Sequence, residues 1–205
     1  EQPPRSVVVS SGTGSGKTEC FLVPILDDLT RQSLAGPLTG VRALFLYPLN
    51  ALINSQRDRL RAWTNALGRR VRFCLYNGNT PGSLPAEMER LFPQEVGARD
   101  TLRSDPPPIL VTNATMLEYM LVRQEDRPIL DLSRGVLRWI VLDEAHTYVG
   151  SQAAEIALLL RRVLHAFGVQ SKDVRFIATS ATIGISSAVP DVIGLANTVL
   201  PSGPL

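Results

Sequence analysis

The sequence predicts an α/β fold: a parallel sheet with helices on both of its faces. Short apolar runs rich in β-branched residues alternate with longer segments of helical periodicity along the whole chain. A glycine-rich loop follows the first apolar run, and polar residues stand directly after two later runs. Because ligands of such sheets lie beyond the carboxyl ends of the strands, we expect these polar segments to form one site.

The expected strands are short, and helical segments separate them. The strands are expected at 7–9, 43–47, 71–76, 109–111, 136–142 and 174–178. Helices are expected from Glu19 onward, over 51–67, over 87–92, from Met116 onward, and from Ser151 to the stop at Gly168. The first strand, Val7 to Val9, reads as buried, and Pro24 is expected to kink its helix or relax the first turns. The stretch from 81 to 108 has a weak apolar pattern and is expected to be the most flexible region.

Composition indicates one ordinary globular domain spanning residues 1–205. Apolar residues make up 44% of the chain and charged residues 20%, and the net charge of +2 permits nucleic acid binding without arguing for it. Cys20 and Cys74 lack metal-ligand spacing, so both are expected to be buried thiols in a reducing, cytoplasmic setting. No apolar run is long enough to predict a membrane span. The two ends of the chain suggest a piece of a longer protein.

The strongest motif is the loop from Ser6 to Thr18, which reads as a phosphate-binding loop. A strand, a glycine-rich turn and a helix follow one another in the required order. Lys17 is expected to reach the β- and γ-phosphates, and the Thr18 hydroxyl to ligate Mg²⁺. Ser11 departs from the strict pattern, which has glycine there. The expected nucleotide-binding residues are Gly12, Thr13, Gly14, Ser15, Gly16, Lys17 and Thr18.

The second motif is Asp143-Glu144-Ala145-His146, directly after an apolar strand. Asp143 is expected to complete the coordination of Mg²⁺, and Glu144 to act as the general base toward the attacking water. With only one other histidine in the chain, His146 is an unlikely zinc ligand and is expected to hydrogen-bond within the site. Ser180 and Thr182, after the last strand, are candidates to couple His146 or the carboxylates to nucleotide state; a simple polar turn is the alternative.

A polar helix face occurs in the segment from 51 to 67. Asn50, Asn54, Arg57 and Arg61 recur at spacings of three and four, so they share one side of the helix. This face is either solvated or directed toward phosphates. The opposite, apolar side is expected to carry Leu52, Gln56, Leu60, Trp63 and Leu67.

Together these motifs resemble those of superfamily 2 DEAD/DEAH-box helicases. The phosphate-binding loop, Asp143-Glu144-Ala145-His146 and Ser180-Ala181-Thr182 are similar to motifs I, II and III of that family. Tyr47-Pro48-Leu49-Asn50 resembles motif Ia, and Val111-Thr112-Asn113 resembles motif Ib. The match extends over nearly the whole chain, and its look is nearest to RecQ-like and Lhr-like DNA helicases.

The resemblance implies a RecA-like fold and an ATP-dependent helicase motor. ATP with Mg²⁺ would bind between this domain and a second RecA-like domain of the same protein, which would supply arginine fingers. Residues 1–205 alone would therefore hydrolyse ATP slowly. The resemblance also implies a nucleic acid partner, DNA rather than RNA, held in a groove that tracks one strand. The groove residues it implies are Pro48, Asn50, Gly78, Thr112 and Asn113.

Four alternatives remain open from the sequence. A duplex translocase of a restriction or remodelling system and an RNA helicase share these motifs. A P-loop small-molecule kinase would be expected to carry an arginine-rich lid and to lack Asp143-Glu144-Ala145-His146. A nucleotide-binding module without catalysis is disfavoured by the presence of Lys17, Thr18, Asp143 and Glu144.

Overall fold

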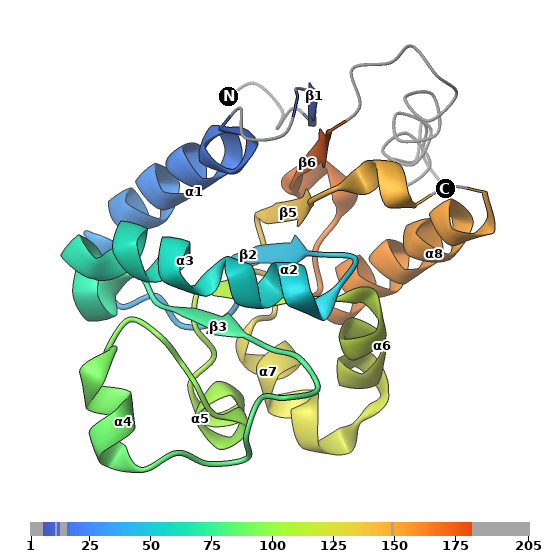
Figure 1. Ribbon diagram of the computed structural model, residues 1–205. Helices are drawn as coiled ribbons and strands as arrows, with labels where there is room; N and C mark the ends of the chain where they lie inside the picture. The colour runs from blue at the N-terminus through green and yellow to red at the C-terminus, as the bar shows by residue number, and fades with distance from the viewer. Residues whose placement is uncertain (1–5, 11, 13–15, 149, 182–205) are drawn as a thin grey trace.

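The computed structural model describes residues 6–10, 12, 16–148 and 150–181, and its centre is a six-stranded parallel sheet (Figure 1). The strands lie in the order β1-β6-β5-β2-β4-β3 and every pairing is parallel. Their bounds are β1 Val7–Ser10, β2 Ala43–Leu46, β3 Phe73–Leu75, β4 Ile109–Thr112, β5 Trp139–Leu142 and β6 Arg175–Ser180. The predicted parallel α/β sheet is confirmed.

Eight α-helices and four short 3-10 helices connect the strands within the described residues. The α-helices are α1 Lys17–Ser33, α2 Asn50–Ser55, α3 Arg57–Thr64, α4 Ala86–Leu91, α5 Arg99–Ser104, α6 Ala114–Val122, α7 Arg127–Leu132 and α8 Ser151–Ala166. The 3-10 helices are η1 Asn65–Arg70, η2 Gln124–Asp126, η3 Ala145–Thr147 and η4 Ser171–Asp173. Helix α1 continues without a break past Pro24, whose exposed position leaves the unpaired carbonyl of the preceding turn open to solvent.

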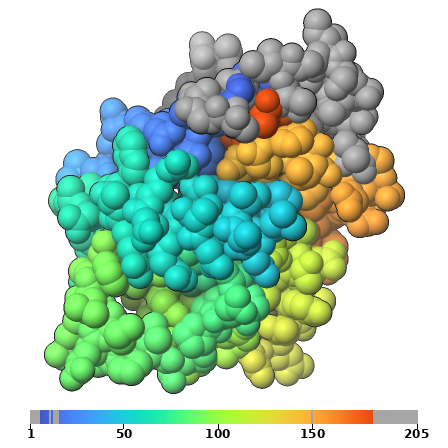
Figure 2. Space-filling model, in the orientation of Figure 1, coloured from blue at the N-terminus to red at the C-terminus, as the bar shows by residue number. Residues whose placement is uncertain are grey.

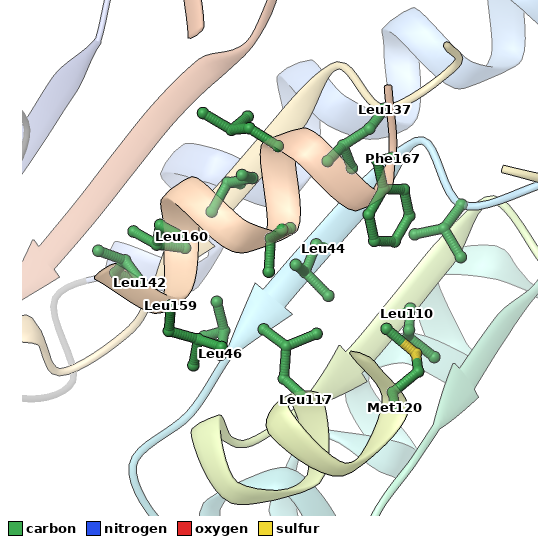
Figure 3. Packing of buried hydrophobic residues seen from close by; sticks show 14 of the residues in the cluster. Leu44, Leu46, Leu110, Leu117, Met120, Leu137, Leu142, Leu159, Leu160 and Phe167 are labelled. Carbon is green, nitrogen blue, oxygen red and sulfur yellow. The ribbon is translucent and has the colours of Figure 1, made fainter. Parts of the chain in front are cut away.

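Two hydrophobic cores, one on each face, hold the helices against the sheet. Successive strand residues alternate between the faces, so in β2 Leu44 and Leu46 enter one core while Phe45 enters the other. Helices α6, α7 and α8 pack on the Leu44 face, where Figure 3 shows Leu117 and Phe167 among the packed side chains. Helices α1, α2 and α3 pack on the Phe45 face. The prediction of helices on both faces is therefore confirmed.

Val7 to Val9 form the predicted parallel strand, but the prediction that this strand is buried is wrong. Val7 is 50% exposed and Val8 38% exposed. Strand β1 pairs only with β6 in the described part of the chain and stands at the edge of the sheet, so its apolar side chains receive cover from one neighbour instead of two. Cys20 was also expected to be buried and is exposed, whereas Cys74 lies in the core, where burial raises the pKa of its thiol.

The single helix expected over 51–67 is broken into α2, α3 and η1. The break falls at Gln56, and Gly68, with φ of 55°, ends helical geometry inside η1. The buried side differs from the predicted one: Ile53, Leu60 and Thr64 face the core, while Trp63 is 41% exposed. The predicted apolar side of this segment is therefore only partly right.

The stretch from 81 to 108, expected to be flexible, is built into the fold. Helix α4 lies where a short helix was predicted, and α5 adds the fully buried Leu102 to the core. Polar contacts also hold this stretch in place. Arg103 of α5 donates from Nε to Asp126 Oδ1 at 2.9 Å, and the Tyr76 hydroxyl donates to Asp126 Oδ2 at 2.7 Å. Asp126 is fully buried, so its charge depends on these two donors.

Replacing Arg103 by alanine is expected to lower the free energy of unfolding by about 3 kcal/mol, because it leaves a buried carboxylate without its cation. Urea denaturation of the two proteins measures the difference. Arg127→Ala is the control: its pair with Asp131 is 69% and 59% exposed, and its loss is expected to cost at most about 0.5 kcal/mol. Equal effects of the two substitutions would contradict the role given to Asp126.

No helix among the described residues has both the length and the apolar character needed to cross a bilayer.

Candidate functional site

The phosphate-binding loop leads from β1 into α1 at the carboxyl end of the sheet. Gly16 has a left-handed backbone (φ 79°), which permits the sharp entry into the helix and favours glycine. Lys17 begins α1 and is 9% exposed, and no described side chain caps the helix start. Unsatisfied N–H groups at such a helix start favour an anion. Thr13, Gly14 and Ser15 lie outside the described residues, and Gly12 is partly buried.

The Thr18 hydroxyl accepts a hydrogen bond from Arg59, a residue that sequence reasoning did not assign to the site. Arg59 Nη1 lies 2.8 Å from Thr18 Oγ1 and 3.2 Å from Gln56 Oε1. Its Nε is 3.7 Å from Glu19 Oε1, so one guanidinium of α3 contacts two neighbouring side chains of α1. Arg59 and Thr18 are 41 residues apart in the sequence, and no local sequence pattern reveals their contact.

Asp143 follows β5 and is held by residues of two neighbouring strands. It is 7% exposed, and the Thr179 hydroxyl of β6 donates to its Oδ1. On the other side stands Tyr47, which follows β2. Burial raises the pKa of the Tyr47 phenol well above its ordinary value, and the Asp143 charge and its hydrogen bond to Tyr47 raise that pKa further. Neither Thr179 nor Tyr47 was among the predicted site residues.

The register of the sheet is the signal that could have identified Thr179. Leu142 of β5 is paired with Ala178 of β6, so the next residues, Asp143 and Thr179, emerge side by side. Thr179 can be identified as a neighbour of Asp143 from the sequence only when the pairing of β5 with β6 is known.

Glu144 adopts a left-handed backbone (φ 51°), the one positive-φ residue other than glycine in the described part of the chain. Its backbone N–H reaches Asp143 Oδ1 at 3.1 Å and Thr179 Oγ1 at 3.2 Å, so the unusual conformation is fixed by the residues around it. The Glu144 carboxylate therefore points in a direction set by the backbone. Its Oε2 lies 3.3 Å from His146 Nδ1.

His146 thus lies next to a site carboxylate, and the hydrogen bond expected for it within the site stays a prediction. Glu144 Oε2, His146 Nδ1 and the Tyr148 hydroxyl are buried atoms without a well-aligned hydrogen-bond partner. All three residues line a groove of about 610 Å³ that also reaches Pro48 and Thr115. Buried polar atoms of this kind call for a water molecule or a ligand group. Ser180 is 8% exposed at the end of β6, and Thr182 lies outside the described residues.

The donor set fits Mg²⁺ bound together with a nucleotide. Mg²⁺ typically takes one or two protein oxygens and fills its remaining positions with water and phosphate. Thr18 and Asp143 supply such oxygens from the ends of β1 and β5, with β6 between them. Within the described residues no group of three or more His, Cys, Asp or Glu side chains could hold a metal alone, so phosphates would have to complete the shell.

The groove residues implied by the resemblance lie at the ends of β2, β4 and β3. Asn113 caps α6 by accepting from the Met116 N–H at 2.7 Å, and its amide donates to Asn50 Oδ1 at 2.6 Å. Asn50 is exposed and begins α2, two residues after Pro48. Gly78 is exposed in the turn after β3, where its carbonyl accepts from Arg99 at 3.2 Å. Four of the five predicted groove residues therefore line one edge of the sheet.

Thr112 is the exception, because its side chain faces the interior. It is fully buried, and its hydroxyl donates to the Tyr76 carbonyl at 2.7 Å. The predicted groove contact therefore does not fit this side chain, which instead fixes the turn after β3 beside β4.

The polar helix face predicted at α2 and α3 is neither fully solvated nor directed as a whole toward phosphates. Arg57 and Arg61 both pair with Glu95, at 3.1 Å and 2.6 Å, and the Glu95 side chain is only 9% exposed. Asn54 accepts from the Asn77 amide at 3.4 Å. Of the four residues on this face, Asn50 and Asn54 are exposed.

The carboxyl edge of the sheet is thus divided between two sets of residues. One half, beyond β1, β6 and β5, holds Lys17 at the start of α1, Thr179 near the end of β6 and Asp143 after β5. The other half, beyond β2, β4 and β3, holds Asn50, Asn113 and Gly78. The border runs between β5 and β2, where the Asp143 N–H donates to the Leu46 carbonyl at 3.0 Å. Figure 2 shows α2 and α3 (cyan and teal) forming the surface between α1 (blue) and the segment that follows β5 (orange).

Comparison with known proteins places this arrangement in a family. The family model described as "DEAD/DEAH box helicase" matches residues 2–189. Druantia protein DruE of Escherichia coli is 30% identical over 87% of this chain and 15% of its own length. The uncharacterized ATP-dependent helicase YprA of Bacillus subtilis is 31% identical over 89% of this chain and 21% of its own length. The chain therefore spans about a fifth or less of these two relatives.

Structural similarity agrees with the sequence relatives. The crystal structure of the DUF1998 helicase MrfA bound to DNA and AMPPNP has a TM-score of 0.65 and 27% identity, covering 93% of this chain and 24% of MrfA. ATP-dependent helicase Lhr-Core of Methanothermobacter thermautotrophicus, 29% identical over 87% of this chain and 20% of its own length, bears out the predicted likeness to Lhr-like helicases. The chain therefore belongs to the DEAD/DEAH box helicase family and has the parallel α/β fold of a RecA-like domain of such proteins.

Proposed function

We propose that this domain binds Mg²⁺-ATP on the β1-β6-β5 half of the sheet edge and a DNA strand on the β2-β4-β3 half, and that hydrolysis alters the grip on the strand. The observation that carries the proposal is the placement of both sets of residues along one edge, joined by a groove. That groove is lined by Glu144 and His146 from one half and by Pro48 and Thr115 from the other.

In the nucleotide half, each side chain has a separate task. Lys17 and the N–H groups at the start of α1 would bind the phosphates. Thr18 and Asp143 would hold Mg²⁺, which when bound neutralises charge on the phosphates. Glu144, with a carboxylate oxygen left without an aligned partner in the described residues, would orient the attacking water and accept its proton. Thr179 and Tyr47 would keep the Asp143 carboxylate in place.

In the other half, the residues are suited to phosphate and sugar rather than to base edges. The exposed Asn50 amide, the partly buried Asn113 amide and the Gly78 turn provide neutral donors and acceptors at the ends of three adjacent strands. Contacts of this kind position a strand without reading its sequence. MrfA, with 27% identity, has been solved with DNA, which favours DNA over RNA as the partner here.

Single-stranded DNA is expected to stimulate ATP hydrolysis by the protein more than RNA or duplex DNA does. The measurement is steady-state phosphate release with each nucleic acid at several salt concentrations, because phosphate contacts make binding salt-dependent. Stimulation by duplex alone would instead favour a duplex translocase, and stimulation by RNA alone an RNA helicase. Hydrolysis that no nucleic acid changes would contradict the proposal.

Asn50→Ala tests the strand contact in the same assay. It is expected to raise the DNA concentration that gives half-maximal stimulation about fivefold, which corresponds to the loss of one hydrogen bond of about 1 kcal/mol, and to leave unstimulated hydrolysis unchanged. Asn65→Ala is the matched control, because Asn65 is exposed at the far end of α3, where η1 begins. An equal effect of the two substitutions would remove Asn50 from the proposed groove.

The activity of the whole protein and its location are also part of the proposal. A second RecA-like domain would close over the nucleotide half and supply an arginine there. Within the described residues of this chain, no arginine is placed at Glu144. A cytoplasmic location is proposed from the two free thiols, one of them exposed.

A further inference from the structure

We propose that Arg59 is a positioning residue that occupies the Thr18 hydroxyl before Mg²⁺ enters and is displaced from it when Mg²⁺-nucleotide binds. This inference rests on the proposed function, because it concerns the residue through which that site would hold its metal. It assigns a role to α3, which neither the motifs nor the family likeness assigned to the nucleotide site.

The first support is the position of the guanidinium. Arg59 Nη1 lies 2.8 Å from the oxygen that would ligate Mg²⁺. Its charge also reaches Tyr47, where it opposes the increase in the phenol pKa that burial and Asp143 cause.

The second support is electrostatic exclusion. A metal on the Thr18 oxygen would lie about 2.1 Å from it, and a guanidinium nitrogen 2.8 Å from the same oxygen would place two cations within about 5 Å of each other. Like charges at that separation repel each other. The Arg59–Thr18 hydrogen bond and the Thr18–metal bond are therefore competing states.

The third support is an alternative place for the displaced side chain. Glu19 stands one residue after Thr18, and its carboxylate is already 3.7 Å from Arg59 Nε. Both side chains are about 40% exposed, so the arginine has room to turn. The same guanidinium nitrogen contacts Gln56, the residue between α2 and α3, so its movement would be felt at the helix that begins with Asn50.

The test compares nucleotide affinity with Mg²⁺ and with EDTA, using fluorescently labelled ADP and the complete protein. In Arg59→Ala the ratio of the two affinities is expected to rise about tenfold over the unsubstituted protein: Mg²⁺ no longer competes with the arginine, and metal-free phosphates lose a nearby cation. Arg59→Lys, which keeps the charge, is expected to restore most of the original ratio. Arg31→Ala, on the same helix as Thr18 but paired with Asp27, is the control and should leave the ratio unchanged.

The outcomes separate the two proposals. If the unsubstituted protein binds labelled ADP but Arg59→Ala leaves the ratio unchanged, or weakens both affinities equally, the role of Arg59 is wrong and the nucleotide site stands. If the unsubstituted protein binds no nucleotide under either condition, the proposed function fails and takes this inference with it. The thermal unfolding of Arg59→Ala is compared with that of Arg31→Ala. Similar unfolding temperatures of the two variants establish that a changed affinity ratio does not come from loss of the fold.

Discussion

Glu144→Gln is expected to lower the turnover number for ATP hydrolysis by about 10²- to 10⁴-fold, the usual contribution of a general base, with little change in nucleotide affinity. The amide has the size of the carboxylate but cannot accept the proton of the attacking water. The left-handed backbone at Glu144 is fixed by Asp143 and Thr179 through the backbone N–H, which the substitution does not alter. Steady-state hydrolysis and labelled-nucleotide binding measure the two quantities.

Glu87→Gln supplies the control for this experiment, because Glu87 lies exposed on α4, beside the β3 edge of the sheet and away from β5. Turnover there should match the unsubstituted protein. If Glu144→Gln hydrolysed ATP at the normal rate, the base would have to be another residue; if it lost nucleotide affinity instead, Glu144 would be a ligand.

Lys17→Ala is expected to act at the earlier step, weakening nucleotide affinity by about 10- to 150-fold and so abolishing hydrolysis at ordinary ATP concentrations. This range corresponds to the loss of a hydrogen bond to a charged group, about 1.5–3 kcal/mol. Lys17 is 9% exposed at the start of α1, so its amine would meet the phosphates in a partly desolvated position. Labelled-nucleotide titration measures the affinity.

The only other lysine provides a matched control. Lys172 lies exposed in η4, before β6 and at the opposite end of that strand from Thr179 and Ser180. Lys172→Ala should leave affinity and hydrolysis unchanged. An equal loss of affinity in the Lys17 and Glu144 variants would contradict the separate roles assigned to them.

The sheet could be predicted from the sequence because each strand is a short apolar run bounded by turn residues, and alternation with helices dictates parallel pairing. The exposure of Val7 and Val8 could not be predicted, because an apolar run looks the same in a central strand and in an edge strand. The break at Gln56 was missed because the helical spacing of apolar residues continues across it, with Ile53 and Leu60 in the same hydrophobic core.

The candidate site was predicted where the chemistry is local. Lys17, Thr18, Asp143 and Glu144 follow directly from the loop and from the residues after β5. Thr179 and Arg59 were missed because their contacts join residues 36 and 41 positions apart, and such contacts depend on strand register and on the placement of α3. Thr112 shows the converse: a motif resemblance located the residue, but side-chain alternation along β4 turned it toward the interior.

The hydrogen bond from the Asp143 N–H to the Leu46 carbonyl has a consequence for how far a signal must travel. Neighbouring strands in a sheet are about 4.8 Å apart, and here one of them ends in the proposed metal ligand while the other runs through Tyr47 into Pro48. A structural change at the phosphates therefore has to pass between only one pair of hydrogen-bonded strands before it reaches the segment that would hold DNA. The change does not have to be transmitted through the hydrophobic core. A shift of Asp143 by well below one ångström would act directly on the strand that leads to the proposed DNA contacts.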